Sequence, residues 1–343
     1  MKTNRKKGLM LGLGYGLAII LDWGIGGCTA WAQSSDTQYQ LPKELSTFTS
    51  RNMTGYFKPL ITTLSEGLHS NYFTSAVYSE KFSLGIDASA QMMLIPKEHK
   101  VFDAELPQAF ANYNIAEIRD ASIARGNTPT TQQPTIYGGK ATPVFAAAQT
   151  GFITPVTFLE GANLNTVISV PNLQLLLGIP TRTQVRLRFI PFTIDNTYQL
   201  TYYSIGVNQQ IDKLFGNTDD KTGGIALHAA YQRLTISGVG GMTLFAGGIH
   251  ASKSLDFLTG YIGAQFERTS GMLEAKRSTS VQLLSNQYQE IRLLQPLKLD
   301  IDVFNSYRIV AGFSLRLLLF EFHLEAGYTA QPFASAGLTF WIF

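Results

Sequence analysis

Apolar and polar residues alternate along much of the chain, most regularly over residues 82–94, FSLGIDASAQMML. Every second residue from Phe82 to Leu94 is apolar, and the positions between them are polar or glycine except at Met93. A period of two predicts a β-strand whose two faces meet different surroundings. These are a core and water in a soluble sandwich, or lipid and a polar lumen in a membrane barrel.

Other segments repeat this pattern and predict further strands. The alternation is clear at 182–189, 225–232, 297–303, 307–319 and 320–326, and weaker near 151–159, 166–178, 198–209, 242–250, 257–268, 271–277 and 286–294. At Leu319-Phe320 the apolar residues change from odd to even positions, which predicts a tight turn there, with a bulge as the alternative. Because bacterial barrels have even strand numbers, we expect 12 or 14 strands.

Composition and the C-terminus favour the membrane barrel. Charged residues make up only 15% of the chain, against about 25% in soluble domains. The chain ends FASAGLTFWIF, and a last strand that closes on an aromatic residue is typical of outer-membrane barrels. We therefore predict an all-β fold, a transmembrane antiparallel β-barrel, with Trp341 and Phe343 as its assembly signal and an interfacial place for these aromatics.

The first 32 residues have the form of a cleaved signal peptide. Basic residues at positions 2, 5, 6 and 7 precede an apolar run over residues 8–21, and Ala30-Trp31-Ala32 forms an A-x-A site. Cleavage is expected after Ala32, with a lipoprotein-like site at Cys28 as the alternative. The leader carries four basic residues and Asp22, so its removal takes the net charge of +3 to near zero. The basic pI therefore gives no reason to expect nucleic-acid binding, and the mature chain holds no cysteine for a disulfide.

The rest of the chain divides into two parts in this interpretation. Residues 33–81 form an N-terminal periplasmic or plug segment, with helix-like apolar spacing over 43–68 that Pro59 interrupts. Residues 82–343 form the outer-membrane barrel. Within them, residues 126–143 are rich in Gly, Pro, Asn, Thr and Gln, which predicts a loop that is external or folded inward.

One block resembles a known family. Residues 59–102 are similar to the N-terminal part of a family of uncharacterised outer-membrane β-barrel proteins of Gram-negative bacteria, with matches at Pro59, Leu60, Gly67, Leu68, Ala76, Pro96, Lys100 and Phe102. His69 stands where the family has Asn, and Tyr72-Phe73 where it has a Trp-Tyr pair. The resemblance implies location and architecture, and it offers no established activity and no catalytic residues.

Charged residues on the polar faces are the candidate functional residues. Arg182, Arg186 and Arg188 share one strand face, and facing lipid would cost each about 2–4 kcal/mol near the bilayer midplane. We therefore expect them in the lumen, either as a cationic strip that selects anions or as ion-pair partners of lumenal carboxylates. The other lumen-facing candidates are Asp300, Asp302, Arg316, Glu321, His323 and Glu325.

Two smaller patterns could carry chemistry, and ordinary lumen polarity is the alternative for each. His250 and Ser252 lie two residues apart, as a nucleophile and its base would on one strand face, but the sequence identifies no orienting acid. Glu321, His323 and Glu325 could bind a divalent metal, although lumenal polarity explains them as well. No cofactor, no metal site and no enzyme activity are expected.

Three functions remain open for a barrel in the outer membrane of a Gram-negative bacterium. The first is a channel or transporter for small solutes, the second a FadL-like route for hydrophobic compounds, and the third a structural or partner-binding component. An outer-membrane lipid hydrolase is the least favoured alternative. The partners expected are outer-membrane lipid, the barrel-assembly machinery and a small-molecule solute.

Overall fold

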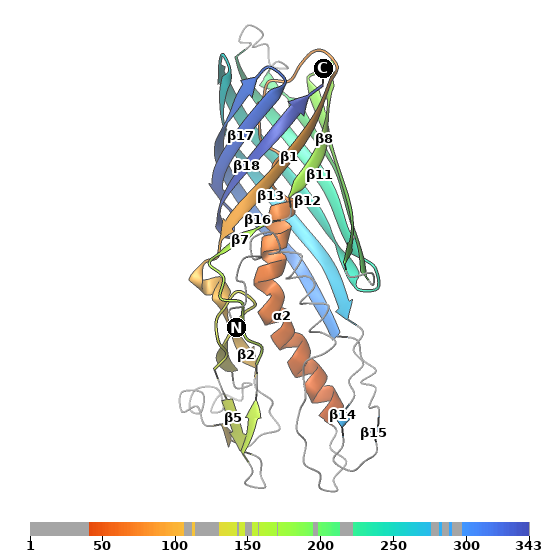
Figure 1. The fold of residues 1–343 in the computed structure, drawn as a ribbon, viewed down its shortest axis with the longest axis vertical. Coiled ribbons are helices and arrows are strands. Elements are labelled where there is room, and N and C mark those ends of the chain that lie inside the picture. Colours follow the sequence, from red (N-terminus) through yellow and green to blue (C-terminus); the bar gives the residue numbers. More distant parts are fainter. Residues whose placement is uncertain are drawn as a thin grey trace, which may run out of the picture.

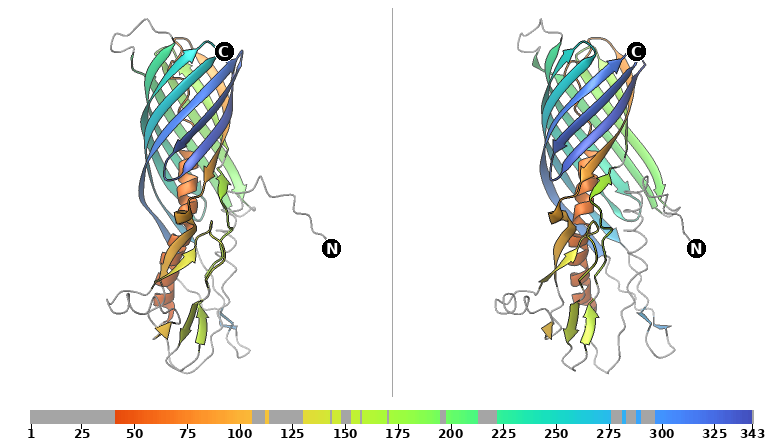
Figure 2. Two further views of the ribbon diagram at one scale, coloured as in Figure 1. Left: turned by 90° about the vertical axis from the view of Figure 1, so that its left-hand side faces the viewer. Right: turned by 60° about the vertical axis from the view of Figure 1, so that its left-hand side comes forward.

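Ten antiparallel strands form a closed barrel, and one long helix enters it from one end (Figures 1 and 2). The computed structural model describes residues 41–105, 112–113, 130–142, 144–147, 153–156, 158–169, 171–194, 198–212, 222–275, 281–282, 288–289 and 297–342. The expected signal peptide and Phe343 lie outside the described residues. Within the described ranges, no helix is long and apolar enough to cross a membrane.

The ring consists of consecutive antiparallel neighbours. Its strands are β1 (Ser83–Leu94), β8 (Asn172–Ile179), β9 (Thr183–Ile194), β10 (Tyr198–Gln210), β11 (Gly223–Ile236), β12 (Gly240–Leu255), β13 (Leu258–Ala275), β16 (Leu297–Leu317), β17 (Phe320–Tyr328) and β18 (Pro332–Trp341). The barrel closes where β18 pairs with β1, with Thr339 opposite Asp87. A short additional strand, β7 (Thr166–Ile168), pairs with the far end of β1. The expected antiparallel barrel is therefore confirmed.

The expected count of 12 or 14 strands is wrong, and the excess has two sources. Segments 257–268 and 271–277 are one strand, β13, and segments 297–303 and 307–319 are one strand, β16. A shift of register between Thr269 and Gly271 interrupts the alternation without ending the strand. The candidates near 151–159 and 286–294 are β6 (Ile153–Val156) and β15 (Tyr288–Gln289), which pair outside the ring.

The reversal of apolar parity at Leu319-Phe320 is a tight turn, as expected. β16 ends at Leu317 and β17 begins at Phe320, and Leu317 lies opposite Phe320 in the ladder. Leu318 has a φ of 57°, the left-handed conformation that a two-residue hairpin turn requires. The two strands therefore each keep apolar side chains on the outside, although their numbering parity differs.

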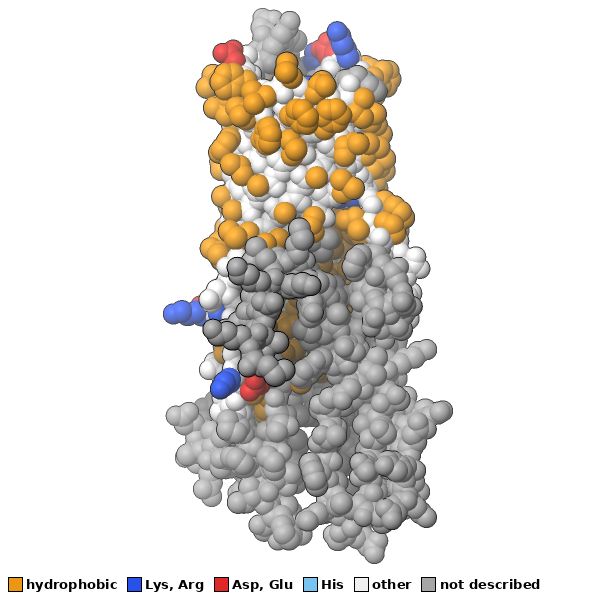
Figure 3. All heavy atoms as spheres, viewed as in Figure 1, with side chains coloured by type: hydrophobic (Ala, Val, Ile, Leu, Met, Phe, Trp, Pro, Cys, Tyr) orange, Lys and Arg blue, Asp and Glu red, His pale blue; other side chains and the backbone are white. Residues whose placement is uncertain are grey.

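Apolar side chains face outward around the ring and polar ones face the lumen. On β17, Phe320, Phe322 and Leu324 are nearly half exposed, whereas Glu321, His323 and Glu325 are buried. On the side of the barrel that Figure 3 shows, hydrophobic side chains are spread over the wall and are densest toward its two ends, and charged ones lie mainly at the rim near the C-terminus and beyond the other end of the barrel. This distribution is the one a barrel needs when lipid lies outside it.

Below the barrel, the helix α2 (Leu41–Leu68) is flanked by a small subdomain, which we call the cap. Its described elements are η1 (Lys97–Lys100), β2 (Val101–Glu105), β3 (Asn112–Tyr113), β4 (Thr130–Pro134), β5 (Val144–Ala147) and β6, all from the segment between β1 and β7, and β14 (Val281–Gln282) pairs with β15 separately. The Asn52 side chain makes two 2.9 Å hydrogen bonds with the main chain of Glu105 and so joins the helix to β2. Part of the expected 126–143 loop is thus strand β4.

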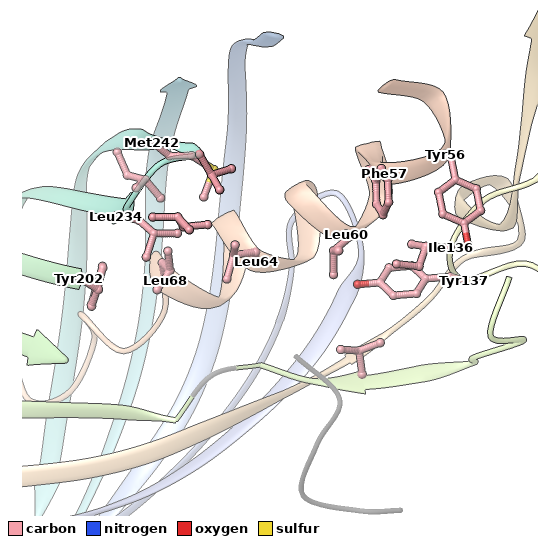
Figure 4. Packing of buried hydrophobic residues seen from close by; sticks show 14 of the residues in the cluster. Tyr56, Phe57, Leu60, Leu64, Leu68, Ile136, Tyr137, Tyr202, Leu234 and Met242 are labelled. Carbon is pink, nitrogen blue, oxygen red and sulfur yellow. The ribbon is translucent and has the colours of Figure 1, made fainter. Parts of the chain in front are cut away.

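The largest hydrophobic cluster of the described residues lies around α2, and smaller ones lie inside the barrel around Tyr72 and Phe73. Leu60, Leu64 and Leu68 recur every four residues on one face of the helix. Leu64 and Leu68 lie toward Leu234 and Met242 on the inner face of β11 and β12, and Leu60 lies toward Ile136 and Tyr137 (Figure 4). Pro59 was expected to break this helix, but the helix continues through it. Packing on both sides of Pro59 compensates for the main-chain hydrogen bond that proline cannot make.

Candidate functional site

The lumen is filled by the chain itself. After α2 ends at Leu68, residues 69–78, which we call the plug, run along the inside of the barrel to the end where β1 begins and β18 ends. Tyr72 and Phe73 at its centre are 0% and 1% exposed. The plug is neither helix nor strand, so its main-chain groups need hydrogen-bond partners from the barrel wall.

Two lumenal arginines bind the plug through its carbonyl groups. Arg188 donates to the Leu68 oxygen at 2.9 Å and to the Ser70 oxygen at 2.8 Å, and its guanidinium lies over the Tyr72 ring. Arg186 donates to the Asn71 oxygen at 2.7 Å and to the Thr74 hydroxyl at 2.8 Å. Both side chains are almost completely buried. The two cations therefore clamp the turn between helix and plug, where Asn71 takes a left-handed φ of 67°.

Amides and a hydroxyl on other strands bind the remainder of the plug. Gln265 donates to the His69 oxygen and Asn208 to the Tyr72 oxygen, at 3.0 and 3.1 Å. The Ala76 N–H donates to Ser252 at 2.7 Å and the Tyr78 N–H to Gln210 at 3.2 Å. Partners from β10, β12 and β13 thus hold the plug along its length and satisfy the main-chain groups of this irregular, buried segment.

Glycines in the wall make room for the two plug aromatics. A Cβ at Gly206 of β10 would lie 2.9 Å from the Tyr72 ring, and a Cβ at Gly263 of β13 would lie 2.4 Å from the Phe73 ring. Both distances are shorter than any side chain allows. The wall and the plug are therefore shaped to each other in this closed arrangement.

A charged group lies where α2 meets the lower rim of the barrel. Arg308 donates to Glu267 at 2.5 Å and to the main-chain oxygen of Glu66 at 2.6 Å. The Glu66 carboxyl accepts hydrogen bonds from Thr329 and from the Ala330 N–H, both in the turn between β17 and β18. Burial raises the pKa of Glu66 to about 7, against the lowering effect of the Arg308 guanidinium. Glu66 therefore fastens the helix end to the rim.

The Glu321–His323–Glu325 ladder faces the lumen, and its members make separate contacts. His323 lies 2.8 Å from the Asp87 carboxylate, which also accepts hydrogen bonds from Thr339 and Gln174. Ser335 donates to Glu325, and the Trp341 indole donates to Glu321 at 2.9 Å. The described residues contain no group of three or more potential ligands that could hold a metal ion.

His250 and Ser252 both contact the plug. Ser252 accepts the hydrogen bond from Ala76, and the His250 Nε2 lies 3.3 Å from the Tyr78 hydroxyl. The two residues that the sequence offered as a nucleophile and its base therefore both lie against the plug.

The structure separates the three arginines that the sequence placed on one lumenal strip. Arg182 lies in the turn before β9, with a φ of 58°, and pairs with Glu80 at the rim. Its expected place in the lumen is wrong because the strand begins only at Thr183. Arg186 and Arg188 do face inward, and the contacts given above are with the plug rather than with Glu321 or Glu325. The side chains of Asp300 and Asp302 lie outside the described residues.

The two remaining candidates lie together at the rim. Arg316 is exposed, and its guanidinium lies over the Trp341 ring, 5.3 Å from the ring centre. The Trp341 indole packs against Gly85 and bonds Glu321, so this ring does not take the interfacial place expected for it. The neighbouring Phe340 faces outward and contacts Phe320.

Sequence reasoning missed the residues that bind the plug through amide side chains. Gln174, Asn208 and Gln265 are lumenal polar positions like many others in the alternating pattern. The available signal was that Gln, Asn and Arg occupy lumenal positions on neighbouring strands while an irregular segment precedes β1.

Comparison with known proteins identifies the family of this chain. A family of unknown function (DUF6588) matches residues 16–342. The chain belongs to this family. The resemblance expected from residues 59–102 is thereby confirmed and extends over nearly the whole sequence. None of the curated proteins searched matches the chain.

Solved structures show only a weak likeness. A loop L8 deletion mutant of OmpT, an outer-membrane protein of Vibrio cholerae, is 8% identical with a TM-score of 0.27, over 76% of this chain and 98% of that chain. OmpT of Vibrio cholerae expressed in the outer membrane is 7% identical with a TM-score of 0.24, over 76% and 97%. At these scores the likeness carries no argument about function.

Proposed function

We propose that the protein is an outer-membrane barrel closed by its own chain, whose role is to anchor the cap and present it to a partner at the cell surface. The observation that carries this proposal is the hydrogen bonding of the plug, in which side chains from several strands bind the main chain of residues 69–78. Because the plug fills the lumen, a structural role of the barrel is favoured over conduction.

The orientation follows from the lengths of the connections at the two ends. At the C-terminal end three of the four connections are short, as at Leu255–Leu258 and Leu317–Phe320, and the one from Gln210 to Gly223 is longer. At the α2 end, the long segments between β1 and β8 and between β13 and β16 leave the barrel. Outer-membrane barrels have short periplasmic turns and longer extracellular loops. The cap and α2 then lie outside the cell, and the plug leads from there back to the periplasmic end.

The strand lengths support a membrane-spanning band. A transmembrane strand needs about 9–11 residues when it is tilted. β17 has nine residues, with Phe320 at one end and Tyr328 at the other, and β18 has ten. Longer strands such as β13, with 18 residues, extend past this band toward the cap.

Surface labelling of engineered cysteines tests the orientation. The sequence has a single cysteine, Cys28, in the expected leader, so a new cysteine is unique in the mature chain. Lys140→Cys lies on the exposed cap and Lys81→Cys on the rim near the C-terminus. In intact cells a membrane-impermeant maleimide should label Lys140→Cys, and Lys81→Cys only after the outer membrane is permeabilised. The reverse pattern, or labelling of neither after permeabilisation, would reject the proposal.

Passage of a solute beside the plug is the second candidate. The lumenal faces of β13 and β17, which flank β16, carry buried polar atoms, including the Tyr261 hydroxyl and one Glu325 oxygen, that have no protein partner among the described residues. Water that entered beside these atoms would satisfy them and, if it extended along the plug, would give small ions a path. Conductance separates the two candidates, because only the second gives steady currents through the intact protein.

A further inference from the structure

The outer wall of the barrel carries a shallow apolar groove that runs from β10 across β11, β12 and β13 to β16. Its volume is about 940 Å³, and it is open along its outer side. The floor is made of small residues, Ala229, Gly248 and Ala264, and the borders of larger ones, Leu227, Ile249, Phe266, Tyr307 and Ile309. Since outward-facing residues of a membrane barrel meet hydrocarbon, acyl chains are the natural contents of this groove.

Aromatic residues close the groove toward the cap. Tyr231 packs against Phe245 with ring centres 5.1 Å apart, and Phe266 packs against Tyr307 at 5.5 Å. Aromatic side chains of this kind gather where the hydrocarbon ends and the headgroups begin. The groove therefore runs up to the level of the lipid headgroups.

Two arginines stand immediately beyond these aromatics. Arg233 follows Tyr231 by two residues on β11, and Arg268 follows Phe266 by two residues on β13, so each shares the outward face of its aromatic neighbour. Register places Arg268 beside Phe245, and Arg233 beside Thr243, to which it donates at 3.3 Å. Both side chains are exposed. They thus flank β12 from its two neighbouring strands.

Their position identifies the chemistry they can bind. Toward the cap, these two are the charged side chains among the described outward-facing residues of the ring strands. An arginine on the lipid face is costly near the midplane and costs almost nothing at the interface, where it reaches headgroup phosphate. Guanidinium groups bind phosphate with two parallel hydrogen bonds, which makes them better suited to this than lysine.

We infer that this surface is a binding site for a phosphorylated glycolipid of the outer leaflet, with phosphate on Arg233 and Arg268 and acyl chains in the groove. The choice of the outer leaflet rests on the proposed function, because it depends on the cap lying outside the cell. The two observations, an apolar groove and a cationic pair at its headgroup end, are independent and match the two halves of one amphipathic molecule.

Binding of lipid A to the purified full-length barrel tests this inference. The arginines are replaced together, Arg233→Gln and Arg268→Gln, and Lys81→Gln at the opposite rim is the matched control. Native mass spectrometry and the temperature of the heat-modifiable gel shift report lipid binding and stability. Lipid A should bind the wild-type protein and Lys81→Gln equally, and the double variant at least tenfold more weakly. Dephosphorylated lipid A should bind all three as weakly as lipid A binds the double variant.

A second variant guards against a folding defect. Ala264→Leu fills the groove from its floor without touching either arginine, and it should also weaken lipid A binding while the barrel still migrates as folded. Equal binding of lipid A by the double variant, or tighter binding of phosphatidylglycerol than of lipid A through the same arginines, would overturn the inference. Surface labelling of Lys140→Cys is independent of these arginines, so it shows separately whether the proposed orientation has failed.

Discussion

Arg186 and Arg188 show how buried cations can hold a segment of chain inside a barrel without lining a path. Each guanidinium donates to main-chain oxygens that would otherwise have no partner in the lumen. A buried acceptor left without a donor costs about 1–3 kcal/mol. The stabilisation by these arginines therefore depends on the plug being in place.

Replacing both arginines should loosen the plug. In Arg186→Ala with Arg188→Ala, the oxygens of Leu68, Ser70 and Asn71 lose donors, so we expect the heat-modifiable transition to occur at a markedly lower temperature. Arg182→Ala is the control, because Arg182 contacts Glu80 at the rim. An equal effect of the control and the double variant would show that the loss is one of general charge rather than of plug contacts.

Glu66 predicts a pH dependence in a defined window. Its pKa is about 7 in the folded barrel, raised by burial, against an ordinary value of 4.5. A raised pKa means that the folded state favours the protonated acid, so the stability contributed by this group is complete below about pH 4.5 and is lost as the pH rises through about 7. The unfolding temperature should fall over that range in the wild-type protein.

Glu66→Gln isolates this contribution. The amide keeps the oxygen that accepts from Thr329 and Ala330 and has no proton to lose. The fall in unfolding temperature between pH 4.5 and 7 should be smaller in Glu66→Gln than in the wild-type protein. Parallel curves for the two proteins would place the pH dependence elsewhere.

At the scale of elements, the fit between β13 and the plug can be tested by adding bulk. A side chain at Gly263 would collide with Phe73, whereas nothing lies within 4 Å of the Cβ position of Gly260 on the same strand. Gly263→Val should therefore lower the unfolding temperature of the barrel, and Gly260→Val should change it little. Phe73→Ala combined with Gly263→Val should recover part of the loss, because the space of the ring is then free.

The alternation of residues predicts strands better than it predicts how many there are. It gave the two faces of β1, β9 and β17 correctly, since the outside and the lumen differ for every residue of a strand. It divided β13 and β16, because the register shift near Thr269 breaks the pattern while the ladder continues. A strand that crosses a bilayer needs only about 9–11 residues. β13 has 18 residues and β16 has 21, so the length of each was compatible with two strands.

The helix and plug were predictable as segments but not in their position. Apolar spacing near residues 43–68 indicates a helix, yet only the packing around Pro59 explains its continuous 28 residues. Nothing in the pattern says that the following ten residues cross the lumen, because their polar partners are spread over β8 to β13. The alternation predicted that Arg186 and Arg188 face the lumen, but it did not predict the groups that they bind.

At the scale of the whole molecule, one chain supplies the barrel, its plug and the cap. α2 is packed against the cap at one end and continues into the plug at the other, so movement of the cap would be transmitted to the lumen. Deleting Phe343 should lower the fraction of protein assembled in the membrane, measured by heat-modifiable migration, if the terminal aromatic is the assembly signal. Full assembly of the truncated chain would remove that assignment.

Planar-bilayer conductance of the refolded full-length protein tests the central claim, that the chain closes its own lumen. The wild-type protein should give no stepwise conductance, since residues 69–78 are bound along the lumen by side chains from several strands. The Arg186→Ala and Arg188→Ala double variant should give discrete openings as the plug is released. Steady open steps of equal size in both proteins would contradict the account and show an open channel.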